Sequence, residues 1–416
     1  TATSSTADTL KGGDGTDTLE IFTAGTAATA ALPKLTSIEK INIYDMDVAF
    51  DASGVSGLTN LNIYRGEGDD TYTVASGVDV AISELVVGTG TDNAATTVAF
   101  SATQTSANLT LDKVTAKGTD ANEDVAITGA KITTVNVTTS GTKSVFDALD
   151  VAAATAVNLD LGVALTAPVE TTGTKGTITV TGTGKATLNA IDTGITTLDA
   201  SGSSGGLVAQ IGAGTDLVLT GSSGNDKITT CTTDALATTD KLSVSGGAGT
   251  DTLVIADASD VNTAADAARY TGFEQVNLSA TQNVKLLSDD ITAVELAAAT
   301  DASITGLSVD QAKDVTITGN QTNSVTLAGR STGGSSDSIT IDLKSGTSTT
   351  NVTVAGGVFT GYETVNINAS TGTAGTDSTT VFATAANTTA INITGTADFA
   401  ATLTSTSSKG VALTST

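Results

Sequence analysis

The sequence predicts an all-β fold: an elongated parallel β-solenoid, partly of the β-roll type, with few short helices. Thr and Val are abundant, and apolar residues alternate with polar ones, which is typical of strands. Aromatic residues make up only 3% of the chain, so the core has to be thin and built from Val, Ile, Leu and Ala. Short motifs also recur, and stacked repeats bury a continuous core that no single repeat could build.

The clearest motif is the nine-residue stretch 12–20, GGDGTDTLE. It matches G-G-x-G-x-D-x-U-x, where U is a large apolar residue, a pattern that binds calcium in stacked β-turns. The glycines permit a tight turn with inward carbonyl oxygens, and the Asp supplies a carboxylate oxygen. A degenerate copy at 3–11 precedes it in the same phase, so we expect the chain to open inside a repeat array. The candidate calcium ligands here are Asp8, Gly12, Gly13, Asp14, Gly15 and Asp17.

A second array begins near residue 211, with copies at 211–219, 221–229 and 246–254. The last copy, GGAGTDTLV, is almost as regular as the first motif, and a weaker echo spans 65–73. Weaker echoes at Asp92 and Asp337 favour plain turns. The candidate calcium ligands of these copies are Gly66, Gly68, Asp70, Gly212, Gly214, Asp216, Gly221, Gly224, Asp226, Gly246, Gly247, Gly249 and Asp251.

Two interpretations of these turns compete. Asp and Gly also populate surface turns for purely conformational reasons, and for Asp8 and Asp70 both interpretations stay open. A single nonapeptide turn offers only part of the six to eight oxygens that calcium prefers. The turn at Gly12–Asp17 therefore requires a partner turn, either from a neighbouring loop or from a segment upstream.

A different element follows each array. An Ile, Phe or Tyr and then E-x-[IV]-N-[IL] occurs at 38–43, 273–278 and 362–367. Its Glu lies 22, 23 and 26 residues beyond Asp17, Asp251 and Asp337, respectively. We interpret each copy as one rung of the coil, with the Glu at a structural corner in preference to a ligand or acid role.

Charge and composition exclude several function classes. Eighteen basic residues against 44 acidic ones give a net charge of −26, which repels nucleic-acid phosphates and anionic membranes. No apolar run approaches the roughly 18 residues of a membrane-spanning helix. The chain has no His, so Ser-His-Asp triads and His-ligated zinc are excluded, and no enzyme is predicted. Cys231 is the single cysteine and predicts a buried or incidental thiol.

The Gly/Ser run at 201–206 suggests a division into two solenoid domains, 1–205 and 206–416, although a loose solenoid turn explains the run equally well. Helix signals are few. Ser259 or Asp260 is predicted to cap one helix that ends near Tyr270, and 310–313 forms one turn at most.

Nonapeptide arrays that alternate with E-x-[IV]-N-[IL] rungs, in an acidic chain without His, resemble the surface-layer proteins of Gram-negative bacteria. The likeness is to the Caulobacter and Campylobacter surface-array kind, within the RTX group of calcium-binding, type I-secreted proteins. The resemblance implies a secreted, cell-surface structural protein that assembles with copies of itself into a two-dimensional lattice in Ca²⁺. It also implies anchoring to lipopolysaccharide through a region outside this chain. Neither nucleic acid nor membrane insertion is expected.

Three alternatives remain from the sequence. A calcium-braced adhesin or extender would use the same solenoid as a stalk, but near-identical modules are expected there and the modules here are irregular. A secreted β-helix enzyme acting on polysaccharides would need aromatic platforms and clustered basic residues, in which the chain is poor. An ice-binding face is disfavoured because the threonines hold no fixed phase.

Overall fold

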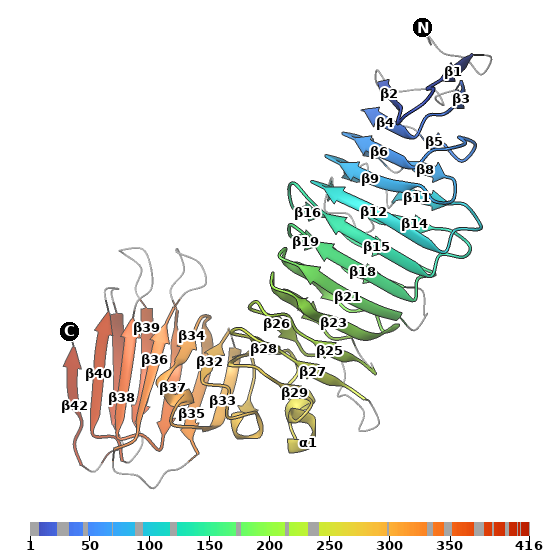
Figure 1. Cartoon of the computed structure of the whole chain (residues 1–416). Helices are drawn as coiled ribbons and strands as arrows, with labels where there is room; N and C mark the ends of the chain where they lie inside the picture. Colours follow the sequence, from blue (N-terminus) through green and yellow to red (C-terminus); the bar gives the residue numbers. More distant parts are fainter. Residues whose placement is uncertain are drawn as a thin grey trace. The chain divides into compact units, whose positions relative to one another are not determined.

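The computed structural model describes residues 8–22, 33–44, 49–68, 70–87, 95–116, 123–171, 176–212, 216–231, 241–297, 299–330, 336–344, 352–369, 378–384, 387–395, 399–405, 407 and 409–415. The chain forms two compact units, Thr1–Asn225 and Asp226–Thr416. In Figure 1 the first unit runs from blue to green and the second from yellow to red, and in each the strands stack as successive rungs. The predicted all-β parallel β-solenoid with few short helices is confirmed.

The first unit is built from parallel strands that stack coil upon coil into three sheets. One sheet contains β2 (Thr18–Phe22), β4 (Lys40–Tyr44), β6 (Asn60–Tyr64), β9 (Asp79–Ser83), β12 (Ser106–Asp112), β15 (Thr134–Thr139), β18 (Ala156–Leu161), β21 (Gly176–Gly182), β23 (Ile195–Ser203) and β25 (Val218–Thr220). The second contains β5 (Phe50–Asp51), β8 (Thr71–Val74), β11 (Thr96–Phe100), β14 (Val125–Thr128), β17 (Leu149–Asp150) and β20 (Val169–Glu170). The third contains β7 (Glu67–Gly68), β10 (Val86–Val87), β13 (Thr115–Ala116), β16 (Ser144–Val145), β19 (Leu165–Thr166), β22 (Ala186–Ala190) and β24 (Leu207–Gln210). A separate pair joins β1 (Thr9–Lys11) to β3 (Lys34–Thr36). The 201–206 run is the end of β23 and the turn into β24.

The core follows from alternation along each strand. In β4 the side chains of Ile41 and Ile43 are fully buried, and their partners in β6, Leu61 and Ile63, are buried beneath them. Each such side chain stabilises the fold by about 1.5–3 kcal/mol through apolar burial. The stack is thus a thin aliphatic column, as the low aromatic content predicts.

Outward-facing amides link successive coils of the first unit. Asn158 donates through Nδ2 to Asn136 Oδ1 (2.8 Å), Asn136 to Asn108 Oδ1 (2.8 Å), and Asn108 to Asp79 Oδ1 (2.7 Å). A second ladder runs from Asn62 through Asn42 to Glu20 (2.7 and 2.8 Å). Both ladders point their N–H groups toward a carboxylate at the N-terminal end, so each carboxylate accepts a hydrogen bond from a polarised row of amides.

The second unit also consists of parallel coils. One sheet contains β26 (Lys227–Thr229), β28 (Thr252–Ile255), β30 (Gln275–Leu278), β32 (Ala293–Leu296), β34 (Val315–Ile317), β36 (Ser338–Leu343), β38 (Thr364–Ala369), β40 (Ala390–Gly395) and β42 (Ala412–Ser415). Another contains β31 (Gln282–Asn283), β33 (Ala299–Leu307), β35 (Gln321–Gly329), β37 (Val354–Thr360), β39 (Ser378–Thr384) and β41 (Phe399–Ser405). β27 (Ser243–Ser245) pairs with β29 (Tyr270–Thr271). Cys231 is free and buried.

The single helix predicted from residue 259 to Tyr270 is wrong in its extent. The segment forms a 3-10 turn, η1 (Ala258–Val261), and one α-helical turn, α1 (Ala264–Ala267). Asp257 caps the first through Ser259 N, and the extended Thr263 caps the second through Asp266 N, so the helix restarts at Thr263 instead of continuing. Two further 3-10 turns are η2 (Val284–Leu286) and η3 (Gln311–Lys313).

Candidate functional site

Two nonapeptide turns share a positive φ at their second and third glycines. In the turn between β1 and β2, Gly13 and Gly15 have φ values of 107° and 112°. In the turn between β27 and β28, Gly247 and Gly249 have φ values of 106° and 132°. Side chains rarely adopt such angles, so the second and third glycines of the motif are required by the turn itself.

The first glycine of each motif is required by close approach instead. A Cβ on Gly12 would stand 1.9 Å from the carbonyl oxygen of Ser37 and 2.6 Å from Asp17 Oδ2. A Cβ on Gly246 would stand 2.0 Å from the carbonyl oxygen of Gly272 and 2.8 Å from Asp251 Oδ2. In both turns a backbone carbonyl oxygen of the next coil and a carboxylate oxygen therefore occupy the space beside the glycine.

The carboxylate oxygens in these turns lack donors. Oδ2 of Asp17 and Oδ2 of Asp251 are buried and accept no hydrogen bond among the described residues. Asp251 is fully buried. Burial raises the pKa of Asp251 to about 6; the N–H of Asp226 opposes this shift, and the carboxylates of Asp226 and Glu274 add to it. A buried oxygen without a donor is costly, and a cation would satisfy it.

Each predicted corner glutamate is hydrogen-bonded to the Asp that lies one coil before it. Asp17 N–H donates to Glu39 Oε2, Asp251 N–H to Glu274 Oε2, and Asp337 N–H to Glu363 Oε2, each at 2.8 Å. In return the carbonyl oxygen of each Asp accepts hydrogen bonds from the N–H of the Glu and of the next residue, at 2.9–3.2 Å. The sequence separation between each Asp and its Glu is therefore one coil of the solenoid.

One part of the corner was missed from the sequence. The residue before each Ile, Phe or Tyr has a left-handed backbone, with φ values of 52° for Ser37, 66° for Gly272 and 90° for Gly361. This bend aims the carbonyl oxygens of Ser37 and Gly272 at the preceding glycine turn. A small residue directly before the E-x-[IV]-N-[IL] rung is a signal that could have indicated it.

The third corner differs in one contact. Glu363 accepts a second hydrogen bond at Oε1 from Asn387 Nδ2, at 2.9 Å. Glu39 and Glu274 each accept a side-chain hydrogen bond only from the Asp N–H among the described residues. The first two corners, which we call open, thus keep one glutamate oxygen available, whereas the third, which we call closed, uses both.

The other copies of the second array are less regular. Asp226 is buried, and its N–H donates to Asp251 Oδ1 (2.8 Å), which places it one coil before Asp251. Asp216 is exposed. Gly224 is explained by packing, since a Cβ there would stand 2.6 Å from the carbonyl oxygen of Ser204. Gly212 is half-buried two residues beyond β24 and Gly221 is buried after β25, while Gly214 and Asp92 lie outside the described residues.

The structure does not bring the weaker echo into the same turn geometry. Gly66 is buried and its carbonyl oxygen accepts from Val86 N (3.0 Å), and Gly68 ends strand β7. Asp70 directly precedes β8, and its carbonyl oxygen accepts from Thr97 N (2.9 Å). Asp8 similarly accepts from Lys34 N (2.9 Å), and Asp14 is exposed in the first turn.

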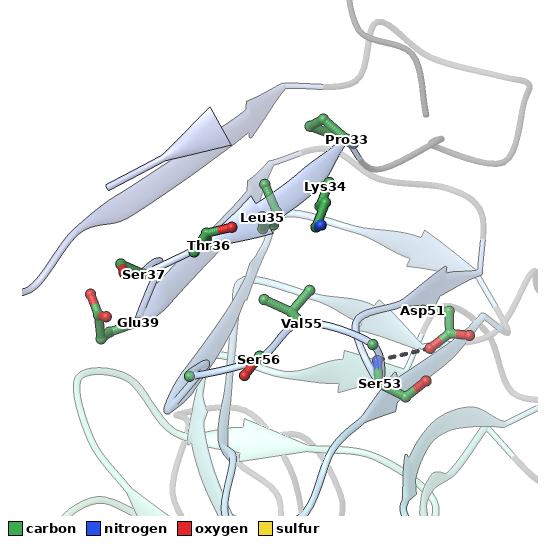
Figure 2. Close-up of a pocket in the computed structure, with 12 residues that line it drawn as sticks. Pro33, Lys34, Leu35, Thr36, Ser37, Glu39, Asp51, Ser53, Val55 and Ser56 are labelled. Atoms are coloured by element: carbon green, nitrogen blue, oxygen red, sulfur yellow. Dashed lines mark hydrogen bonds between the residues drawn. The ribbon is translucent and has the colours of Figure 1, made fainter. Parts of the chain in front are cut away.

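A hollow beside the N-terminal coils offers no catalytic constellation. It measures about 750 Å³ and is lined by Pro33–Ser37, Glu39, Asp51 and Ser53–Gly57. Figure 2 shows Glu39 and Asp51 at opposite ends of it, and Asp51 accepts a hydrogen bond from Ser53 N (2.9 Å). These two carboxylates do not converge as a general acid and base would.

Side-chain ligands alone do not define a metal centre here. Within the described ranges no group of three or more His, Cys, Asp or Glu side chains is arranged to hold a metal ion. The glycine turns would supply mainly backbone carbonyl oxygens, with one or two carboxylates, and this hard-oxygen set fits calcium. Among the helices that the structure describes, none has the length and apolarity to span a bilayer. No protein-family model matches the chain, and the search of curated proteins found no match.

Proposed function

We propose that this chain is a calcium-dependent structural protein that assembles with copies of itself into a two-dimensional layer on a bacterial cell surface. One observation carries the calcium dependence. Two turns far apart in the sequence, at Asp17 and Asp251, share the same left-handed glycines and the same buried carboxylate oxygen without a donor among the described residues. Conformational need explains the glycines, but it does not explain the carboxylate oxygens.

Charge supports the same proposal. A net charge of −26 strains the metal-free coil through self-repulsion, and bound divalent cations relieve it. Calcium would complete the folding of each glycine turn and bridge acidic faces of neighbouring copies. Because metal binding is coupled to folding, export through a calcium-poor cytosol by type I secretion and folding outside the cell follow from the proposal. Anchoring to lipopolysaccharide would use a region outside this chain.

The irregular coils favour a lattice over an adhesin stalk of repeated modules. Hydrogen-bonded residues in successive coils are 18 residues apart at Asn277 and Glu295 but 30 residues apart at Val114 and Ser144. Such variation gives each coil its own loops, which suits specific contacts between copies. A polysaccharide-active enzyme has less support, because the chain lacks His and the hollow that Glu39 and Asp51 line has no convergent acids.

Circular dichroism and electron microscopy of the purified chain test the proposal. With millimolar CaCl₂ we expect full β-content and ordered two-dimensional arrays, and with excess EGTA we expect reduced β-content and dispersed molecules. MgCl₂ at the same concentration is the control for ionic strength and should not restore the arrays. Identical spectra and identical assembly in CaCl₂ and EGTA would contradict the proposal.

A further inference from the structure

We infer that calcium at the two glycine turns is shared between successive coils, with the corner rung of the next coil completing each site. The Asp carboxylate comes from one coil, and the carbonyl oxygen of the left-handed residue and the second oxygen of the corner Glu come from the next. The two sites are Asp17 with Ser37 and Glu39, and Asp251 with Gly272 and Glu274. This inference rests on the proposed calcium dependence and identifies the partner that each nonapeptide turn requires.

Two hydrogen-bond acceptors converge beside the first glycine of each turn. Beside Gly246 the carbonyl oxygen of Gly272 and Asp251 Oδ2 both lie within 3 Å of the point that a Cβ would occupy. The same holds beside Gly12 for the carbonyl oxygen of Ser37 and Asp17 Oδ2. Two acceptors that face the same glycine, with no donor for the carboxylate oxygen among the described residues, call for a cation between them.

The Asp251 side chain is held in place in the interior. Asp251 is fully buried, so water does not easily replace the missing donor at Oδ2. Its other oxygen, Oδ1, is already held by Asp226 N–H at 2.8 Å. The side chain is therefore fixed in position with one oxygen left to coordinate.

The corner glutamate brings a second carboxylate to the turn. Glu274 Oε2 is held by Asp251 N–H at 2.8 Å, which brings the two carboxylates together across one coil step. Asp and Glu provide two negative charges, which balance the two positive charges of one calcium ion. Two stacked carboxylates without an ion would instead repel each other. Carbonyl oxygens of the turn and water would fill the rest of the six to eight positions.

The third corner supplies the contrast within the same chain. Asn387 Nδ2 donates to the second oxygen of Glu363 at 2.9 Å. Both oxygens of the Glu363 carboxylate thus accept hydrogen bonds from protein groups, and we expect no metal ion at this corner. It therefore serves as a matched control.

Calcium binding to the full chain tests the inference. The double variant E39Q/E274Q and the control E363Q are titrated with CaCl₂ by isothermal calorimetry, and bound calcium is counted by mass spectrometry after gel filtration. Gln keeps an oxygen that accepts the Asp N–H, so the coil corner persists while the charge is lost. We expect E39Q/E274Q to weaken binding about tenfold, equal to about 1.4 kcal/mol per site, and E363Q to bind as the wild type does.

The possible outcomes distinguish the shared site from the calcium dependence itself. Wild-type binding that E39Q/E274Q leaves unchanged would overturn the shared site but not the calcium dependence. Equal losses in E363Q and E39Q/E274Q would also overturn it, since the glutamates would then act only through stability. No heat and no bound calcium in the wild type at millimolar CaCl₂ would overturn both the inference and the proposed function.

Discussion

The corners at Asp251–Glu274 and Asp337–Glu363 lie in the same unit and have the same hydrogen bonds between Asp and Glu. They differ in the number of hydrogen bonds that the glutamate side chain accepts. Both glutamates accept the Asp N–H at 2.8 Å, but only Glu363 also accepts an amide, from Asn387. A single side chain one coil further along thus decides whether a carboxylate oxygen remains for a metal ion. The hydrogen bonds between Asp and Glu are structural in both corners.

The register identifies the position that decides this difference. Thr389 N donates to the carbonyl oxygen of Glu363, and Asn387 lies two residues earlier. Thr292 N donates to the carbonyl oxygen of Glu274, so the matching position is Asp290. In the first corner Thr59 N donates to Glu39, and the matching position is Gly57. Neither Asp290 nor Gly57 carries an amide donor in its side chain.

Removal of calcium is the largest expected perturbation. Two sites filled at a hundred times their Kd would contribute about 5 kcal/mol together, because each adds RT ln(1 + [L]/Kd). We therefore expect the midpoint of urea unfolding to fall when EGTA replaces CaCl₂ in the wild type. MgCl₂ serves as the control cation. An unchanged midpoint would remove the distinction between open and closed corners.

In EGTA, truncation of the corner glutamate should lower the free energy of unfolding more at the third corner than at the second. Glu363→Ala removes two hydrogen bonds from a buried carboxylate and is expected to cost about 3 kcal/mol, whereas Glu274→Ala removes one and is expected to cost about 1.5 kcal/mol. The free energies of unfolding in EGTA measure this. A larger loss for Glu274→Ala would mean that the second corner has protein partners beyond those described.

Asp290 is the residue of the second corner whose position matches that of Asn387. Asp290→Asn places an amide donor where Asn387 stands in the closed corner, so we expect several-fold weaker calcium binding with less than about 1 kcal/mol change in EGTA. Asp310→Asn, at an exposed carboxylate paired with Lys313, is the control for lost charge. Equal calcium affinity of the two variants would show that the amide position does not close the site.

Four acidic residues of the first unit, Asp124, Asp147, Asp150 and Glu170, interact outside the two glycine turns, and we call them the acidic column. They test whether carboxylates without such a turn behave differently. Burial raises the pKa of Asp124 to about 6, and Glu170, Asp147 and Asp150 add to the shift. The folded state therefore binds this proton more tightly than the unfolded state, and the resulting stability is lost as pH rises from about 4 through 6. Asp124→Asn should flatten that pH dependence and stabilise the chain at pH 7 equally in CaCl₂ and EGTA. Stabilisation confined to EGTA would indicate calcium at this column.

The coil architecture was predictable from the sequence, and the completed corner was not. Period-two alternation in segments such as 40–44 fixes inward Ile and outward Asn, and the spacing from Asp17 to Glu39 is one coil. The roles of Ser37 and Asn387 depend on which backbone lies beside which turn, and this is set by coil lengths that differ along the chain. Gly224 was interpreted as a ligand, whereas close stacking on Ser204 already accounts for its lack of a side chain.

An anomalous difference map from crystals grown in millimolar CaCl₂ would test whether calcium lies in the two glycine turns. We predict one peak beside Gly12, between Asp17 and Ser37, one beside Gly246, between Asp251 and Gly272, and no peak at the Asp337–Glu363 corner. A well-resolved map with both glycine turns empty, or with a peak at the closed corner instead, would contradict this prediction.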